Sequence, residues 1–282
     1  MQLMRAFPIL LAWLVLAGSA RAAEPLVACG HPIYPPLSWD QNGQLTGVAP
    51  DVVQRLFGEL GYSVQLDVRG NWKRCLREAR EGQVDIVVSA YITDERREYL
   101  SYASEYVVND PVAVFVNRQH SFPFQQLDDL KDKTAGLLLG DSFGDRFDRY
   151  VRREGHIEWV SRGEQNFAKL ALGRIDYMPL GRETGRLQSL RLKLHGIIEP
   201  LPGALTTEHY YIAVRRAGAL EAHLAYINQR LRELHADGTL AQLQTHYSQQ
   251  YLNADTSSPA QPSQASPSLK ASPDETPTPP GP

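Results

Sequence analysis

The sequence predicts an α/β protein of two lobes, each a mostly parallel sheet flanked by helices. In the first third of the chain, β-branched runs alternate with amphipathic helical patterns, and the order β-α-β-α-β favours a parallel sheet with right-handed crossovers. Two further β-rich runs, near Val112–Asn117 and Thr207–Val214, lie far apart in the chain, as expected for segments that cross between two lobes and form a hinge. We therefore expect a first lobe of residues 23–113 and 208–252 and a second lobe of residues 114–207.

The two ends of the chain are not expected to belong to these lobes. Residues 1–22 have a basic start, an apolar run at Phe7–Ala17 and the small-residue pattern Ala20-Arg21-Ala22, which together predict a cleaved secretory signal peptide and a periplasmic location. Residues 253–282 are mainly Pro, Ser, Thr and Ala. Such a segment buries too little apolar surface to offset its ordering entropy, so we expect a disordered tail.

Composition limits the class of partner. Removal of residues 1–22 would take away two of the 29 lysines and arginines and none of the 32 acids, which shifts the net charge from −3 to −5. A mildly acidic protein is a poor partner for nucleic acid or an anionic membrane, so we expect neither. The histidines are scattered, with no two at metal-ligand spacing beside Cys or Asp, and no phosphate-loop motif is present. We expect a monomer that binds neither a metal nor a cofactor.

The first lobe is predicted from its alternating patterns, taken in chain order. Strands are expected at Leu26–Cys29, Tyr62–Val68 and Val84–Val88, and helices at Asp51–Leu60 and Trp72–Glu81. Asn71 is placed to cap the second of these helices. Between the first strand and the first helix, the prolines of Gly30–Trp39 exclude helix, and Asp40–Gln44 is predicted to be a turn.

The remaining elements follow with less regular patterns. We expect a strand at Val112–Val116, a helical turn at Leu127–Lys133, a strand at Thr134–Leu139, a helix ending near Arg153, a helix at Asn166–Gly173 and a strand at Arg174–Met178. The chain then returns through Tyr210–Val214. Ala219–His235 has leucines along one face, which predicts a helix, and Leu240–Tyr251 is expected to be the last helix.

Two cysteines, Cys29 and Cys75, are compatible with one disulfide. Cys29 ends the first strand, and Cys75 lies in the first turn of the helix that crosses from the second strand to the third. In a sheet of order 2-1-3 that helix lies over the first strand, so the two side chains can meet. An oxidising compartment favours the bond. Two buried free thiols are the alternative.

Candidate ligand-binding residues follow the strands of the first lobe. The carboxyl ends of parallel strands share one edge of a sheet, where open α/β sheets bind ligands. This edge is predicted to carry aromatic and hydroxyl side chains: Tyr34, Trp39, Trp72, Ser89 and Tyr91. Aromatic side chains with a few polar groups are typical of small-molecule sites. Any one of the aromatics could instead be a packing residue, and Trp72 could simply anchor its own helix.

Arg96 is the central candidate. Thr93-Asp94-Glu95-Arg96 opens a short helix just beyond the third strand, with Thr93 as its N-cap and acids in its first turn. A guanidinium at that place can hold a carboxylate through two parallel hydrogen bonds. The alternative is a surface helix in which Arg96 pairs with Glu95 or Glu98 in solvent, an interaction that is worth little.

These motifs resemble those of periplasmic solute-binding proteins of family 3, the amino-acid-binding type. The resemblance is carried by Ile92-Thr93-Asp94-Glu95-Arg96, by Ser101-Tyr102-Ala103-Ser104-Glu105-Tyr106 and by the loop Tyr34-Pro35-Pro36-Leu37, and it covers roughly residues 26–252. It implies a two-lobed periplasmic-binding-protein-like fold of type II, hinge closure around a solute, and delivery to an ABC-type transporter or a receptor. It also implies that Arg96 holds the α-carboxylate of the ligand.

The second lobe matches the family less closely. Gly140-Asp141-Ser142-Phe143 resembles the loop that completes the carboxylate site, a role for Asp141 or Ser142, although a plain turn is the alternative. Gly173-Arg174-Ile175-Asp176 resembles a family motif that is followed, five residues on, by an acid for the ligand's ammonium group. Gly181 stands at that position, followed by Arg182. Either Glu183 substitutes, or the ligand is another anion held by Arg96 and Arg182, unless Arg182 is merely solvated.

Two other functions are compatible with this scaffold. A periplasmic enzyme resembling the dehydratases of this family would need an acid or base in the cleft, for which Glu183, Glu105 and His31 are candidates, but no convincing catalytic pair is present. A ligand-sensing module would pass its signal to a separate membrane partner. The leading prediction is a binding protein for a small carboxylate-bearing or amino-acid-like solute.

Overall fold

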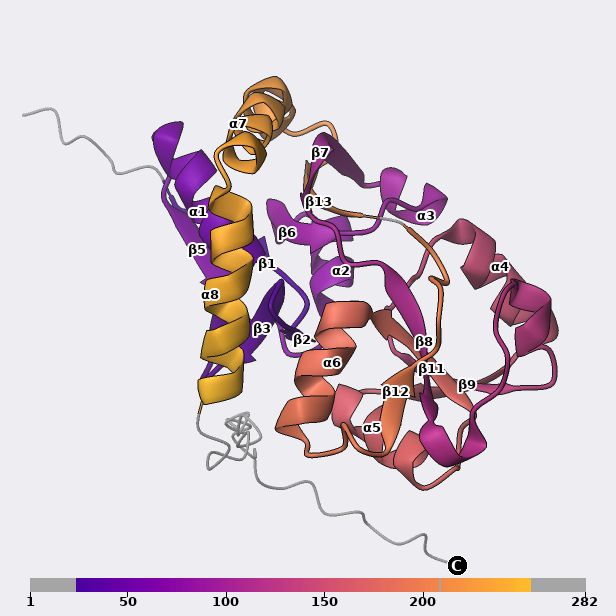
Figure 1. The fold of residues 1–282 in the computed structure, drawn as a ribbon. Coiled ribbons are helices and arrows are strands. Elements are labelled where there is room, and N and C mark those ends of the chain that lie inside the picture. Colours follow the sequence, from indigo (N-terminus) through magenta and orange to yellow (C-terminus); the bar gives the residue numbers. More distant parts are fainter. Residues whose placement is uncertain (1–23, 208, 255–282) are drawn as a thin grey trace, which may run out of the picture.

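Two five-stranded sheets form the framework of the protein (Figure 1). The computed structural model describes residues 24–207 and 209–254, so the predicted signal peptide and nearly all of the predicted tail lie outside the described residues. The first sheet has the order β5-β1-β6-β13-β7. Its strands are β1 (Leu26–Cys29), β5 (Val64–Asp67), β6 (Ile86–Ala90), β7 (Leu100–Val108) and β13 (Tyr210–Arg215). The strands β5, β1 and β6 are parallel, which confirms the predicted order 2-1-3, whereas β13 runs antiparallel to both of its neighbours.

The second sheet repeats this plan with the order β10-β9-β11-β8-β12. Its strands are β8 (Val112–Asn117), β9 (Thr134–Leu138), β10 (His156–Val160), β11 (Tyr177–Gly181) and β12 (Ile198–Pro200). Here β10, β9 and β11 are parallel, and β8 is antiparallel to β11 and β12. Each sheet thus has a parallel core and one strand, β13 or β8, that lies beside a crossing between the lobes.

Helices cover the two sheets. They are α1 (Val48–Glu59), α2 (Trp72–Arg80), α3 (Asp94–Arg97), α4 (Asp145–Glu154), α5 (Gly163–Ala171), α6 (Arg182–Arg191), α7 (Leu224–Ala236) and α8 (Thr239–Asn253), with 3-10 turns η1 (Arg118–His120), η2 (Leu127–Leu130) and η3 (Ala219–His223). Among the described residues, no helix combines the length and the apolar character needed to cross a membrane. The predicted cap residues of two helices are confirmed: the side chain of Asn71 accepts from the amide of Arg74, and that of Thr93 from the amide of Arg96.

The chain crosses twice between the lobes, and the two crossings touch. The first follows β7 and the second precedes β13 (Figure 1). Val112 at the start of β8 exchanges two backbone hydrogen bonds with the returning segment, donating to Thr206 and accepting from Leu205. Two short, paired segments of this kind can bend together, as a hinge requires.

The predicted disulfide is present. Cys29 at the end of β1 is bonded to Cys75 in the first turn of α2, across a sequence separation of 46 residues. Both cysteines are buried. The bond ties the loop after β1 to the start of α2, and both of these segments contribute residues to the pocket described below.

Several elements differ from prediction. The Pro-rich loop and the following turn form a small sheet of β2 (Ile33–Tyr34), β3 (Ser38–Gln41) and β4 (Gln44–Thr46). The strand β11 begins three residues later than expected because Asp176 is used to bind the start of β9: its carboxylate accepts from the amide of Thr134, and its amide donates to the Thr134 carbonyl. The strands β7, β10 and β12 and the helix α6 were not anticipated.

Candidate ligand-binding site

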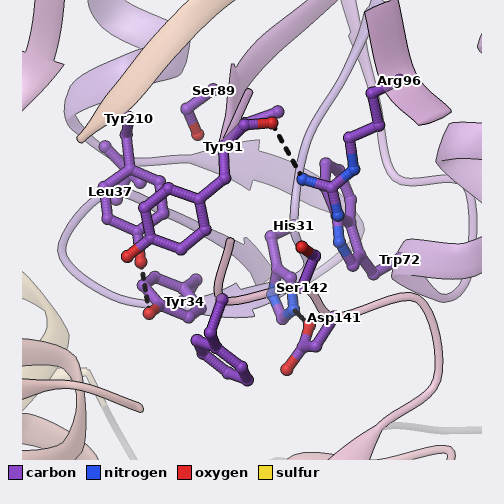
Figure 2. Close-up of a pocket in the computed structure, with 12 residues that line it drawn as sticks. His31, Tyr34, Leu37, Trp72, Ser89, Tyr91, Arg96, Asp141, Ser142 and Tyr210 are labelled. Carbon is purple, nitrogen blue, oxygen red and sulfur yellow. Dashed lines mark hydrogen bonds and ion pairs between the residues drawn. The ribbon is translucent and has the colours of Figure 1, made fainter. Parts of the chain in front are cut away.

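A pocket lies between the lobes, at the carboxyl ends of β1 and β6 (Figure 2). Its lining combines aromatic, small and polar side chains: His31, Tyr34, Leu37, Trp72, Ser89, Ala90, Tyr91, Arg96, Asp141, Ser142, Phe143 and Tyr210. Seven of the nine residues predicted to bind the ligand are therefore brought together here, together with His31.

Arg96 lies at one side of the pocket and contacts both lobes. The residue is 4% exposed. One guanidinium nitrogen donates to the Tyr91 carbonyl at 3.1 Å, and another donates to the Gly140 carbonyl of the second lobe at 3.1 Å. The guanidinium carbon also lies 5.5 Å from the centre of the Trp72 ring, a cation–π distance. Two of the five N–H groups of the guanidinium are thus bound to carbonyls, and neither of these contacts neutralises its charge.

Three tyrosines form the opposite side of the pocket, as Figure 2 shows. The rings of Tyr91 and Tyr210 are stacked with centroids 4.4 Å apart, and the rings of Tyr34 and Tyr210 are 5.3 Å apart. The Tyr210 hydroxyl donates to that of Tyr34, which also accepts from the Gly181 amide at 2.9 Å. Burial raises the pKa of Tyr34 and Tyr210 well above the usual value, so both hydroxyls are neutral hydrogen-bonding groups at physiological pH.

His31 and Asp141 join the lobes between these two sides. The ring nitrogen Nε2 of His31 lies 3.1 Å from Oδ1 of Asp141, and Nδ1 accepts from the Ile33 amide at 3.2 Å. Because Nδ1 acts as an acceptor, the neutral ring carries its proton on Nε2 and donates it to the carboxylate. The ring also packs against Trp72, with centroids 5.4 Å apart. From the sequence, His31 is predicted only to be a catalytic candidate or a structural loop residue, so its place in the pocket is a new feature.

The loop from Gly140 to Gly144 presents the Gly140 carbonyl to Arg96, and the amides of Asp141 and Phe143 are bound within the second lobe. The amide of Asp141 donates to the Leu138 carbonyl, and the Phe143 amide donates to Asp148. The hydroxyl of Ser142 also donates to Asp148, at 2.5 Å. Burial raises the pKa of Asp148, and these two hydrogen bonds oppose the shift. Asp148 therefore holds the loop in a shape that turns the Gly140 carbonyl towards Arg96.

Asp110, which the sequence analysis missed, explains why glycine stands at position 181. The carboxylate of Asp110 is buried and accepts from the amides of Glu183 and Thr184, at 2.9 and 3.3 Å, and from the Thr184 hydroxyl at 3.1 Å. It therefore caps α6 from another segment of the chain. A Cβ atom on Gly181 would lie 2.1 Å from the carboxylate, so Asp110 occupies the space of a side chain at 181. Burial raises the pKa of Asp110.

Two predicted site residues do not reach the pocket. Trp39 is buried in the first lobe, where its ring packs edge-on against Tyr247 and Tyr251 of α8 at 5.9 and 5.5 Å. Arg182 points along the second lobe and donates to the carbonyls of Leu201 and Gly203. Each side chain is held by its own lobe, and neither belongs to the pocket lining.

The candidate acids and bases of the enzyme hypothesis are not gathered in one place. Glu183 pairs with Arg186 on the surface of α6, and Glu105 pairs with Arg232 of α7. Of the three candidates only His31 lines the pocket. Within residues 24–207 and 209–254, no group of three or more His, Cys, Asp or Glu side chains is arranged to hold a metal ion.

Tyr210, Leu37 and Phe143 line the pocket but were not predicted individually. Leu37 and Phe143 lie within loops that were singled out, so their neighbourhood was the signal. Tyr210 begins β13 and reaches the pocket from the returning segment of the chain. Its place in the pocket depends on how β13 is aligned with its neighbouring strands. A short stretch of sequence does not show that alignment.

Comparison with known proteins gives a consistent result. The family described as bacterial extracellular solute-binding proteins, family 3, matches residues 26–250. The L-cystine-binding protein TcyJ of Escherichia coli (strain K12) is 25% identical over 214 residues, which are 74% of this chain and 77% of that protein.

Solved structures show the fold. An ancestral arginine-binding protein bound to arginine superposes with a TM-score of 0.67 at 22% identity and covers 80% of this chain and 99% of its own. A histidine kinase sensor domain with similarity to periplasmic binding proteins superposes with a TM-score of 0.66 at 20% identity, covering 80% and 96%. These likenesses confirm the predicted two-lobed, periplasmic-binding-protein-like α/β fold.

Proposed function

Since the chain belongs to the bacterial extracellular solute-binding proteins of family 3, we propose that this solute-binding protein captures a small amino-acid-like carboxylate between its lobes and delivers it to an ABC-type transporter. The observation that carries the choice of a carboxylate is Arg96, a buried guanidinium in the pocket whose two bound partners are neutral carbonyls. Burying a charge without a counter-ion is unfavourable, and a ligand carboxylate would supply one through charge-assisted hydrogen bonds.

The remaining polar groups of the pocket suit a zwitterion. Asp141 is the one acid among the lining residues, and it lies on the second lobe. It would face an ammonium group if its contact with His31 were exchanged for the ligand. Glu183, the substitute considered from the sequence, is held away by Arg186. Ser89 is also buried in the lining, and its hydroxyl has no hydrogen-bond partner in the structure, so it is available to a ligand oxygen.

Capture would proceed by hinge closure. Residues 23–113 and 208–252 would form one rigid lobe and residues 114–207 the other, with the paired crossings beside Val112 as the hinge. Opening would break the contacts of Arg96 with Gly140 and of His31 with Asp141, both of which join the lobes. Closure over a ligand would restore them in a space from which water is excluded, where ionic hydrogen bonds are stronger.

The cellular setting follows from the same proposal. A family of extracellular solute-binding proteins fits export through residues 1–22 and action in the periplasm as a monomer. The relatives' names support an amino-acid ligand: one binds L-cystine, and one was solved with arginine. The likeness to a kinase sensor domain concerns the fold alone, and capture of the solute would be the first step in a sensor as well.

The test is the replacement of Arg96 by lysine, combined with a melting-shift screen of L-amino acids and dicarboxylates. Lysine keeps the charge but cannot form the two parallel hydrogen bonds of a guanidinium. We expect the best ligand of the wild type to lose roughly 10- to 100-fold in affinity, as expected when one charge-assisted hydrogen bond is lost. Arg182→Lys is the matched control, because Arg182 also donates to carbonyls but lies outside the pocket. Equal affinity of Arg96→Lys and wild type would refute the proposed site.

A further inference from the structure

The two lobes also touch along a seam outside the pocket. The second lobe contributes α6 and the first residue of α5, and the first lobe contributes β2 and the last two turns of α8, which lies beside α6 (Figure 1). The Gln188 side chain of α6 donates to the Ile33 carbonyl of β2 at 3.1 Å. A Cβ atom on Gly163 of α5 would lie 2.7 Å from Cδ1 of Ile33, so the backbone of the second lobe approaches β2 closely there. None of these three residues lines the pocket.

One end of this seam is a contact between Arg191 and Tyr251. Arg191 is the last residue of α6, and its guanidinium carbon lies 4.5 Å from the centre of the Tyr251 ring of α8, a cation–π distance. Both residues are half-buried. At the other end of α6, the Ser248 hydroxyl of α8 donates to the Glu183 carboxylate at 3.4 Å. The last helix of the first lobe therefore contacts both ends of α6.

The first lobe holds Tyr251 in place. Its ring packs edge-on against Trp39 of β3 at 5.5 Å, and the neighbouring Gln250 side chain donates to that of Gln41 at 2.8 Å. Burial raises the pKa of Tyr251, and Arg191 of the second lobe opposes that rise, so the ring is neutral at physiological pH. The first lobe thus presents a fixed aromatic face to a cation of the second lobe.

The direction of α6 makes this contact sensitive to opening of the lobes. Asp110 of the first crossing binds the amides of Glu183 and Thr184, so the first turn of α6 stays beside the hinge. Arg191 lies eight residues beyond Glu183, which is about 12 Å along a helix. A hinge motion that tilts α6 by roughly 20° would move Arg191 by about 4 Å, which takes the guanidinium beyond the ~6 Å limit of a cation–π contact. The contact therefore belongs to the closed arrangement of the lobes.

From these contacts we propose that Arg191 and Tyr251 are positioning residues that stabilise the closed lobes, and that they set the affinity of the pocket without touching a ligand. The proposal rests on hinge closure, as the proposed function does, and adds residues outside the pocket that control it. A contact made only when the lobes are closed raises the closed fraction of the free protein, and the apparent affinity rises with that fraction. Because the contact does not involve the ligand, its loss weakens all ligands by one common factor.

Calorimetry with L-arginine, L-histidine and L-cystine tests the proposal on the full chain after removal of residues 1–22. Arg191→Met removes the guanidinium and keeps a long side chain, and Tyr251→Leu removes the aromatic face. We expect each variant to bind each of these amino acids about 3- to 10-fold more weakly, as the loss of a half-buried cation–π contact implies. The double variant should resemble the single variants, because the two residues form one contact. Tyr251→Phe keeps the ring and should bind within about twofold of the wild type.

Tyr247 supplies the matched control on the same helix. It stands one turn before Tyr251, and its ring packs edge-on against the same Trp39 at 5.9 Å. Its hydroxyl donates to Asp51 of α1 at 2.9 Å, so these contacts lie within the first lobe. Tyr247→Leu should lower Tm and leave the three affinities unchanged. A purely structural role of α8 would instead make the variants at 247 and 251 behave alike.

The outcomes separate this proposal from the proposed function. Wild-type affinities in Arg191→Met and Tyr251→Leu overturn it, as do unequal factors among the amino acids that bind, or an equal weakening by Tyr247→Leu. If none of the three binds, spin labels on the exposed positions of Gly58→Cys and Leu172→Cys, one on each lobe, decide it. Arg191→Met should then lengthen the distance between the labels without ligand, and an unchanged distance overturns the proposal. Arg96→Lys judges the proposed function separately, which stands if only the variants of the seam behave as the wild type.

Discussion

Replacing Gly181 with alanine tests the buried carboxylate beside the hinge. The backbone of Gly181 has φ −50° and ψ 135°, which any residue can adopt, so the substitution introduces no backbone strain. Its effect is steric: the new Cβ would lie 2.1 Å from Oδ2 of Asp110, 2.8 Å from Cγ of the same side chain and 2.9 Å from the Tyr34 hydroxyl. Ordinary contacts of a Cβ atom begin near 3.4 Å, so the Asp110 carboxylate would have to move by more than roughly 1 Å.

That movement of the Asp110 carboxylate breaks its hydrogen bonds to α6, because they have ordinary lengths and cannot be stretched much further. Asp110 accepts at 2.9, 3.3 and 3.1 Å from the first turn of α6, and a shift of roughly 1 Å takes each beyond hydrogen-bonding range. Loss of an N-cap costs about 1–2 kcal/mol, and a buried group left without partners adds about 1–3 kcal/mol. Because water can reach part of a loosened cap, we expect a total of about 2–4 kcal/mol. For a chain of this size that corresponds to a fall in Tm of roughly 5–15 °C.

The assay is thermal unfolding monitored by circular dichroism or calorimetry. Gly58→Ala is the matched control: Gly58 is an exposed residue of α1 with nothing within 4 Å of a built Cβ, so alanine there should raise stability slightly. In an Asp110→Ala background, Gly181→Ala should cost much less than in the wild type, which a double-mutant cycle would report as positive coupling. If Gly181→Ala melts within 1–2 °C of the wild type, Asp110 does not fill this space, and the reasoning is refuted.

Three further predictions concern the frame of the site. Cys75→Ser, or reduction of the bond to Cys29, should lower the unfolding free energy by about 4 kcal/mol, as loop-closure entropy for a separation of 46 residues implies; an unchanged Tm under reducing conditions would contradict this. Asp148 has a raised pKa in the folded state, so the folded protein keeps this proton to higher pH than the unfolded chain, and stability falls as pH rises through the range just above 3.8. Asp148→Asn should remove that part of the pH dependence of Tm, and a profile parallel to the wild type would be the contrary result. Tyr34→Phe should cost about 1–3 kcal/mol in chemical denaturation, because it leaves the Gly181 amide and the Tyr210 hydroxyl without their acceptor, and a cost near zero would show that water replaces it.

The parts of the fold that could be predicted are those whose signal is local. The strands β1, β5 and β6 are short β-branched runs, and the N-cap residues Asn71 and Thr93 stand directly before their helices. Each of these features can be predicted from a few consecutive residues. Arg96 was found for the same reason, since its position follows from the end of β6 and the start of α3. The disulfide could be predicted once the order of the first three strands was known.

Two of the missed elements, β10 and α6, have only a weak local apolar pattern. The strand β10 is an edge strand of five residues with mostly exposed or half-buried side chains, and its apolar Trp159 is 47% exposed, so the short alternation of its sequence is not matched by burial. The helix α6 buries Thr184, Gly185 and Ser189, and a Cβ on Gly185 would meet the ring of Phe115 at 2.2 Å. Because small and polar residues make up most of its buried face beside Leu187, α6 shows little of the 3.6-residue apolar periodicity on which the prediction depended.

The most informative departure from the family pattern is at position 181, where the resemblance implies an acid and the chain has glycine. Considered along the motif, the change removes a carboxylate from the second lobe and leaves only Glu183 as its replacement. In space the carboxylate is present: Asp110, 71 positions earlier, enters from the first crossing and binds the amides that an acid at 181 could cap as the N-cap residue of α6. The two acids cannot coexist, because they would occupy the same volume. An acid at 110 therefore requires a glycine at 181. This pair of residues connects the N-cap of α6 to the crossing segment about which the lobes would turn.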